Sequence, residues 1–146
     1  MGESNCRSTD DFSLAYVLLR ATLGVNIAVH GISRILAGVG VFTAVLEKQF
    51  AATLLPHFAV RAFGSALPWA EASIGLLVLA GAATLLALVA GGLLILVLTF
   101  GSSLHQDWEI AGLQLIYAIV YSLLIAFRKY NLLSLDRLFT RWRRNG

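Results

Sequence analysis

An apolar stretch of the chain, residues 12–37, carries four polar side chains at helical spacing. Asn26, His30 and Arg34 follow one another at intervals of four residues. At about 100° per residue, these three side chains lie on one side of a helix, and Arg20 lies on the same side. Histidine changes its charge near neutral pH, whereas arginine and asparagine donate hydrogen bonds. This combination suits a site that holds carbonyl groups and exchanges protons.

Quinones are the cofactor class that matches such a site. Their head groups have two carbonyls that accept hydrogen bonds, and oxidation of a quinol requires a proton acceptor such as His or Glu. The candidate catalytic residues are therefore His30, Glu71 and His105. The candidate cofactor-binding residues are Arg20, Asn26, Arg34, Gln114, Tyr117 and Tyr121.

Other cofactors fit the sequence less well. Two histidines on different helices can ligate haem, but the chain has neither a cysteine attachment motif nor a four-histidine bundle. Zinc requires three or four convergent ligands, and the spacings here are not diagnostic. The single cysteine, Cys6, cannot form an internal disulfide, and we interpret it as a bystander. We predict neither haem nor metal.

The composition indicates a membrane protein. Of the 146 residues, 58% are hydrophobic and 13% are charged, and the mean hydropathy is +0.80. A soluble domain of this size needs far more charge. A transmembrane helix takes about 20 apolar residues, so the apolar blocks provide about four spans. We predict an all-α integral membrane protein, a four-transmembrane-helix bundle that forms one domain over residues 1–146.

The central apolar region must contain two spans. No charged or imidazole side chain occurs in the 33 residues between Glu71 and His105. A single helix of that length measures about 50 Å, well beyond a hydrocarbon core of about 30 Å. We place a tight turn near residues 81–84. The predicted spans are residues 12–37, 62–82, 85–104 and 110–127.

A shorter segment, residues 41–54, connects the first two spans. It carries Glu47, Lys48 and Gln49 among apolar neighbours, so it is too short and too charged to cross a bilayer. We predict an amphipathic helix that lies at the membrane interface. The alternative is a lid that caps the bundle.

The segment 128–146 forms a basic tail. Six of the eleven Lys and Arg residues lie after residue 127, and only Asp136 opposes them. By the positive-inside rule this tail is cytoplasmic, and four spans place both termini on that side. Apolar side chains accompany the charges, so we expect contact with membrane lipids, including anionic headgroups, and not with nucleic acid.

The predicted topology groups most polar residues near the outer side. The expected outer cluster consists of Asn26, His30, Arg34, Glu71 and the segment 105–109. A charged group that faces lipid costs several kcal/mol, so these side chains are expected to face one another or a site. A purely structural ion pair between Arg34 and Glu71 is the alternative.

Arg20 belongs to a deeper level of the bundle. Gln114, Tyr117 and Tyr121 form one stripe on the last span, and Tyr121 lies at nearly the depth of Arg20. We expect a bonded contact between Arg20 and Tyr121, with Tyr117 nearby. Alternatively, backbone carbonyls, hydroxyls and a tyrosine satisfy the guanidinium and fix the register of the bundle.

The chain resembles the DoxX family of small membrane proteins, which includes the DoxD-like thiosulfate:quinone oxidoreductase subunits. The residues that carry the resemblance are Leu19-Arg20, Leu23-Gly24, His30-Gly31, Pro68, Glu71, Gly75, Phe100-Gly101, Asp107-Trp108, Gly112, Gln114-Leu115, Tyr117, Asn131 and Ser134-Leu135-Asp136. The resemblance implies a four-helix bundle in the bacterial cytoplasmic membrane, quinone or thiol redox chemistry, and other redox proteins as partners. It also points to Arg20, His30 and Glu71 as functional residues.

Three functions are compatible with these observations. The first is a quinone-linked oxidoreductase subunit that is not a complete enzyme alone. The second is a non-catalytic accessory subunit of a larger membrane complex, and the third is a small-molecule permease. The expected partners are membrane lipids and other membrane or redox subunits, and a homo-oligomer is left open.

Overall fold

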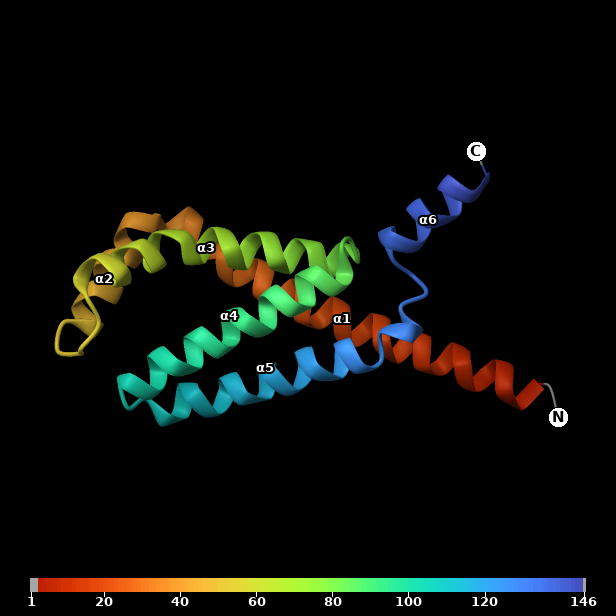
Figure 1. Ribbon diagram of the computed structural model, residues 1–146, viewed down its shortest axis with the longest axis horizontal. Coiled ribbons are helices and arrows are strands. Elements are labelled where there is room, and N and C mark those ends of the chain that lie inside the picture. Colours follow the sequence, from red (N-terminus) through yellow and green to blue (C-terminus); the bar gives the residue numbers. More distant parts are fainter. Residues whose placement is uncertain (1–2, 146) are drawn as a thin grey trace.

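A computed structural model describes residues 3–145 of the chain, and it describes the side chains of residues 10–140 and of Trp142. The side chains of Cys6, Arg141, Arg143 and Arg144 lie outside the described residues. All regular elements in the described range are helices (Figure 1). They are α1 (Glu3–Ala37), α2 (Val39–Phe50), α3 (His57–Ala80), α4 (Thr84–Leu104), α5 (Trp108–Ala126), the 3₁₀ helix η1 (Arg128–Tyr130) and α6 (Leu135–Asn145).

Four of these helices are long and apolar enough to cross a membrane, as the composition predicts. The candidate spans are Asp10–Ala37, His57–Ala80, Thr84–Leu104 and Trp108–Ala126. The turn predicted near residues 81–84 is confirmed, since Gly81 ends α3 in the left-handed conformation and α4 begins at Thr84. The second span begins earlier than predicted because Pro56, which has extended backbone angles, directly precedes the first turn of α3.

Small residues bring α1 and α3 into close contact. A side chain at Gly24 would collide with the backbone of Leu79, and one at Gly75 would collide with Ala28. Such close backbone approach is how helices associate in lipid. Lipid tails are as apolar as leucine, so an apolar side chain gains little by exchanging lipid for another helix. On the other side of the bundle, Gly91 of α4 makes room for the ring of Tyr121 of α5. The bundle therefore consists of two helix pairs, α1 with α3 and α4 with α5.

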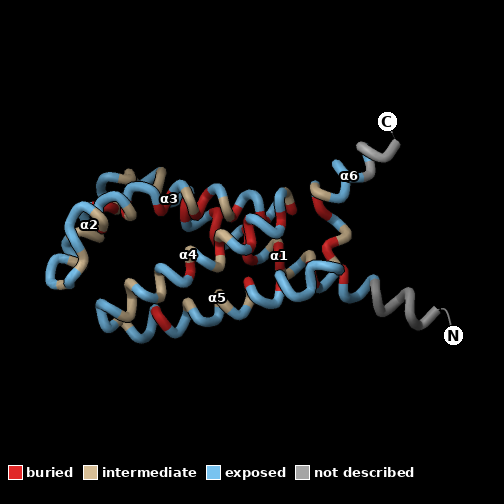
Figure 2. Tube along the Cα trace, viewed as in Figure 1, coloured by how far each residue is buried: buried red, intermediate tan, exposed pale blue. Residues whose placement is uncertain are grey.

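The two pairs pack directly against each other in the middle and toward one end of the bundle (Figure 2). We call this end, where η1 and α6 lie, the terminal end, and we call the opposite end the α2 end. Toward the α2 end the α4–α5 pair diverges from the α1–α3 pair (Figure 1). The shared core joins all four helices, and Figure 2 shows its buried positions gathered in the middle of the bundle and toward the terminal end. Its members are Tyr16, Leu23, Ile27, Val78, Ala87, Leu88, Ile95, Tyr121 and Leu124.

The helix predicted over residues 41–54 exists as α2, which packs on α3. At its end, the ring of Phe50 lies 5.9 Å from the imidazole of His105, in a tilted arrangement, and close to Gly101. The segment between the first two spans thus reaches across to the α4–α5 turn. Its placement at a membrane interface stays a prediction.

Candidate functional site

Arg34 of α1 and Glu71 of α3 form an ion pair within the α1–α3 pair. The Glu71 side chain is 6% exposed and that of Arg34 is 30% exposed. The guanidinium carbon of Arg34 also lies 4.7 Å from the centre of the Phe42 ring, in cation–π contact. The ion pair named as the alternative reading of these two residues is therefore present.

A second polar contact connects the two helix pairs. The Tyr117 hydroxyl of α5 donates a hydrogen bond of 2.9 Å to Oδ1 of Asn26 on α1. Because the pairs diverge beyond this level, the contact marks the last polar link between α1 and α5 on the way to the α2 end (Figure 1).

His30 lies on α1 between these two contacts. It is one turn from Asn26 and one turn from Arg34, and its direction differs by about 40° from each. Since Asn26 faces α5 and Arg34 faces α3, His30 points between the two helix pairs. The residue is exposed, and it has no hydrogen bond or ion pair within the described part of the chain.

Gln114 occupies a similar level on α5. It lies about 4.5 Å along the helix axis from Tyr117 toward the α2 end, while His30 lies about 6 Å from Asn26 in the same direction. Its Nε2 donates to the Ser102 hydroxyl on α4 at 3.1 Å. Its Oε1 is buried, and the described residues offer it no donor. We call the group of Asn26, His30, Arg34, Glu71, Gln114 and Tyr117 the α2-end cluster.

The segment 105–109 does not join this cluster, which corrects the prediction. Asp107 is used locally, because its carboxylate accepts a hydrogen bond of 3.1 Å from the amide of Ile110 and caps α5. His105 packs against Phe50, and Glu109 is exposed. The divergence of the helix pairs separates this turn from Arg34 and Glu71.

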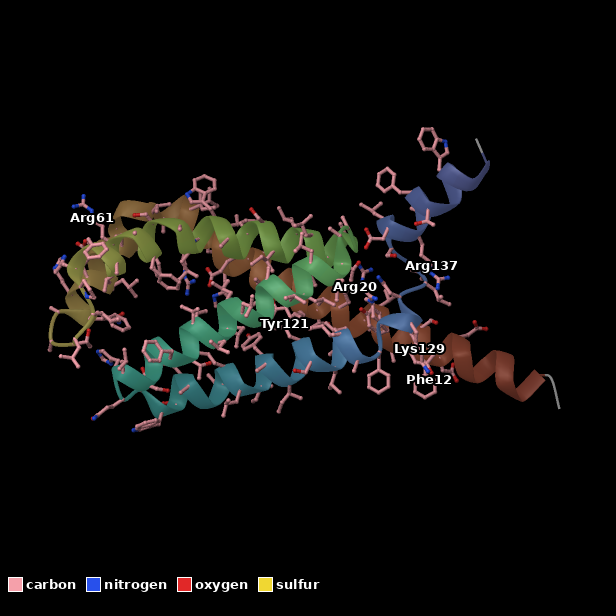
Figure 3. The ribbon with its side chains drawn as sticks, viewed as in Figure 1. Phe12, Arg20, Arg61, Tyr121, Lys129 and Arg137 are labelled. Atoms are coloured by element: carbon pink, nitrogen blue, oxygen red, sulfur yellow. The ribbon has the colours of Figure 1, made fainter. Side chains whose placement is uncertain are left out.

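The predicted bond between Arg20 and Tyr121 is wrong. Arg20 is buried, and its guanidinium donates hydrogen bonds to the carbonyls of Val78 at 3.0 Å, Leu79 at 3.3 Å and Leu133 at 2.8 Å. The last carbonyls of α3 and the segment after η1 come closer to Arg20 than the phenol does. Tyr121 instead packs against Gly91, farther toward the middle of the bundle (Figure 3). The alternative for Arg20 is therefore present in part, since carbonyls accept from both terminal nitrogens of the guanidinium, while its buried Nε has no partner among the described residues.

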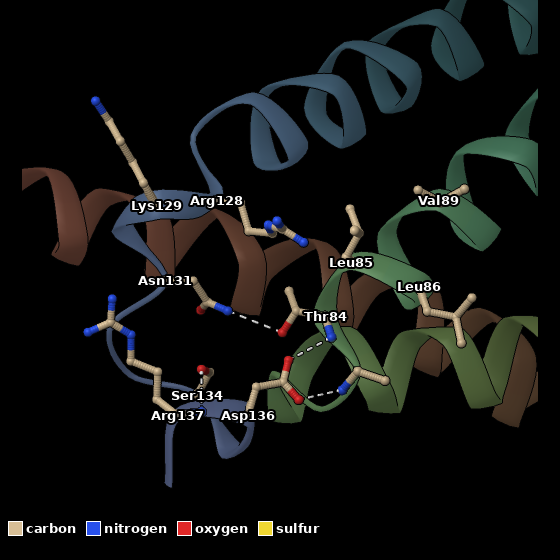
Figure 4. A pocket seen from close by; sticks show the side chains of 11 residues that line it. Thr84, Leu85, Leu86, Val89, Arg128, Lys129, Asn131, Ser134, Asp136 and Arg137 are labelled. Atoms are coloured by element: carbon tan, nitrogen blue, oxygen red, sulfur yellow. Dashed lines mark hydrogen bonds between the residues drawn. The ribbon is translucent and has the colours of Figure 1, made fainter. Parts of the chain in front are cut away.

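Sequence reasoning missed two further residues at the terminal end. The carboxylate of Asp136 accepts hydrogen bonds from the amides of Ala83 at 2.7 Å and Thr84 at 2.8 Å, so a residue of α6 caps α4 (Figure 4). Nδ2 of Asn131 donates to the Thr84 hydroxyl at 3.1 Å. Both residues carry the family resemblance, but no local pattern predicts a cap that comes from 52 positions away. We call Arg20, Gly81, Thr84, Asn131 and Asp136 the terminal network.

The hydrogen bonds also set the charge state of Asp136, which lies outside the candidate spans. Partial burial by itself would raise the pKa of this carboxyl. The hydrogen bonds from Thr84 and Ala83, together with the positive charge of Arg20, outweigh burial and lower the pKa below its ordinary value of 3.8. Asp136 is therefore ionised near neutral pH.

Comparison with known proteins finds no matching family model, curated protein or solved structure. Among the residues that the structure describes, no three His, Cys, Asp or Glu side chains converge as they would to hold a metal ion.

Proposed function

We propose that the chain is a quinone-binding subunit of a bacterial membrane oxidoreductase and a member of the DoxX family, with both termini in the cytoplasm and α2 at the outer interface. The quinone head group binds at the α2-end cluster. The redox step, in which a quinol yields a quinone, two protons and two electrons, requires an electron acceptor on a partner subunit. The family resemblance of residues 14–136 and the contents of the α2-end cluster support this function.

One observation carries the proposal, namely the exposure of His30 inside a candidate span. A polar side chain that faces hydrocarbon without a partner is costly, and ionisable residues in spans are usually retained for a pathway or a site. His30 points between the two helix pairs, where their divergence leaves the imidazole without a partner among the described residues (Figure 1). A ligand or a partner is expected to satisfy the imidazole.

The chemistry of the neighbouring groups fits a quinone head group. The imidazole N–H of His30 can donate to one carbonyl, and the unpartnered Oε1 of Gln114 can accept from the hydroxyl of the reduced form. Glu71, the carboxylate of the α2-end cluster and the ion-pair partner of Arg34, is the group that accepts the released proton in this proposal.

A specific observation also favours the second function, a non-catalytic accessory subunit. Arg34 and Glu71 satisfy each other, as do Tyr117 and Asn26, so most of the α2-end cluster is stable without a ligand. In this case His30 contacts a partner subunit rather than a quinone.

Quinone binding by the purified full chain distinguishes the two functions. The protein in nanodiscs is extracted to identify any bound quinone and is then titrated with a short-chain benzoquinone, with empty nanodiscs as the reference. His30→Ala should weaken binding about tenfold, the value of one good hydrogen bond. Gln114→Ala should weaken it less. Thr22→Val, a change at an exposed polar residue of the same helix, is the matched control and should leave binding unaltered.

Absence of quinone binding to the wild type, or equal binding by wild type and His30→Ala, would rule out the proposed function. Loss of a co-purifying partner protein on His30→Ala, without any quinone binding, would establish the accessory function instead.

A further inference from the structure

A groove of about 670 Å³ lies at the terminal end, far from the α2-end cluster. The start of α4 forms one wall, and η1, the segment after it and the start of α6 form the other (Figure 4). Nothing in the proposed quinone chemistry involves this groove.

The α4 wall of the groove is apolar and exposed. Leu85, Leu86 and Val89 are 42%, 70% and 41% exposed. All three belong to the first turns of a candidate membrane span. This wall therefore continues into the surface of α4 that faces the hydrocarbon of a bilayer.

The opposite wall is cationic. Arg128 and Arg137 line the groove and are exposed; Figure 4 shows Arg128 extending toward Leu85, while the Arg137 guanidinium points away from α4. Neither guanidinium has a carboxylate partner among the described residues. Lys129 also lines the groove, but its ammonium lies 4.9 Å from the centre of the Tyr130 ring, and it points away from α4 in Figure 4.

The one acidic residue that lines the groove forms no ion pair with either guanidinium, so its single negative charge leaves the groove positive overall. Both carboxylate oxygens of Asp136 accept hydrogen bonds from the amides that begin α4. Since these amides are occupied, an anion in the groove would be held by the two guanidinium groups and not by the helix N-terminus. The cap also fixes the start of α6 and so places Arg137 beside the groove.

We infer that this groove binds one anionic phospholipid from the leaflet on the side of the chain termini. The Arg137 guanidinium turns toward Arg128 when the lipid binds, so that the phosphate lies between them. An acyl chain runs along Leu85, Leu86 and Val89. The pairing of guanidinium groups with an exposed apolar wall selects an amphiphilic anion over a small one, because a free phosphate would leave that wall uncovered. Exposed apolar residues of α6, including Leu138 and Phe139, extend the same membrane-facing surface.

Lipid titration followed by native mass spectrometry tests this site. The full chain is purified in detergent, stripped of lipid and titrated with phosphatidylglycerol or with phosphatidylcholine. The wild type should bind one phosphatidylglycerol about tenfold more tightly than phosphatidylcholine, because cations near the surface attract anionic headgroups. The double variant Arg128→Gln/Arg137→Gln should lose this preference.

The matched control removes two positive charges at the other end of the molecule. Lys48→Gln/Arg61→Gln has the same net charge as the double variant and alters exposed residues of α2 and α3. This control should keep the preference for phosphatidylglycerol, and circular dichroism should give the same helix content for all three proteins.

Three results would overturn the inference. The first is equal affinity of the wild type for the two lipids, and the second is an unchanged preference in Arg128→Gln/Arg137→Gln. The third is displacement of bound phosphatidylglycerol by millimolar inorganic phosphate, which would identify a site for small anions. Failure of phosphate to compete supports the lipid.

Discussion

The two ends of the bundle hold their polar groups in different ways. At the terminal end, every polar partner of Arg20 is a backbone carbonyl, and the carboxylate of Asp136 is held by two backbone amides. The bond from Asn131 to Thr84 is the exception there, because it joins two side chains. At the α2 end, side chains contact side chains, as in Arg34 with Glu71 and Tyr117 with Asn26.

The difference matters because a side-chain partner can rotate to another rotamer, whereas a backbone partner in a packed segment cannot. Carbonyls and amides of packed helices cannot turn away, so the terminal network fixes the relative positions of α1, α3, α4 and α6. Side chains can exchange partners when a ligand enters. We therefore assign stability to the terminal network and binding to the α2-end cluster, and the predictions below test this division.

The largest expected effect is at Arg20. Arg20→Met removes three hydrogen bonds from a charged donor and leaves the carbonyls of Val78, Leu79 and Leu133 with fewer partners. We expect a loss of about 3 kcal/mol in the free energy of unfolding, with quinone affinity of the folded protein unchanged. Thermal unfolding in detergent, followed by circular dichroism, measures the loss. Arg61→Met, which alters an exposed arginine, is the control, and an equal loss in both variants would contradict the division.

Glu71→Gln should lower quinone affinity more than it lowers the free energy of unfolding. Glutamine still accepts a hydrogen bond from Arg34 but removes the negative charge, so we expect a smaller loss of stability, about 1 kcal/mol. Quinone affinity should fall more than in Ser73→Ala, an exposed control on the same helix. A stability loss as large as that of Arg20→Met, with binding unaltered, would make Glu71 a structural residue.

Acidification should weaken the terminal end through Asp136. Its pKa is lower in the folded protein than in the unfolded chain, so its ionised form contributes stability above about pH 4 and loses it as the pH falls through the folded value. Asp136→Asn should cost about 1 kcal/mol near neutral pH, as removal of a helix cap does. The difference in melting temperature between variant and wild type should shrink as the pH decreases. A difference that is constant with pH would show that the charge of Asp136 is irrelevant.

The smallest effects concern the two turns. Ala83 at the terminal end and Gln106 at the α2 end both have left-handed backbone angles, with φ of 45° and 60°. Ala83→Gly and Gln106→Gly should each stabilise the protein by about 0.5 to 1 kcal/mol, because glycine adopts this conformation without steric cost. Equal increases in melting temperature would show that the two ends differ in their side chains and not in their turns. A decrease in melting temperature for Ala83→Gly would show that the methyl group of Ala83 is needed there.

The sequence predicted those features that depend on composition and local pattern. Long apolar blocks predicted four candidate spans, and the uncharged stretch before His105 correctly required a turn near Gly81. The helical spacing selected Asn26 and Tyr117 as polar residues of the interior, but it assigned them to different levels of the bundle, whereas the structure joins them by a hydrogen bond.

What failed was the choice of partner between distant segments. Depth along each helix suggested Tyr121 for Arg20, but depth says nothing about how far two helices are apart or which loop folds over their ends. The carbonyl of Leu133 lies 113 positions from Arg20 in the chain. Every residue has a backbone carbonyl, so no sequence pattern shows which one accepts from Arg20. For the same reason, the separation of the 105–109 segment from Glu71 followed only from the divergence of the helix pairs.

The cap supplied by Asp136 has a consequence for how the protein is made. Synthesis proceeds from the amino terminus, so Arg20 is made long before Leu133, and α4 is made before its cap. Until residues 131–136 leave the ribosome, the first amides of α4 and one arm of the guanidinium lack their final partners. Residues 131–136 therefore complete contacts that α1, α3 and α4 cannot make among themselves.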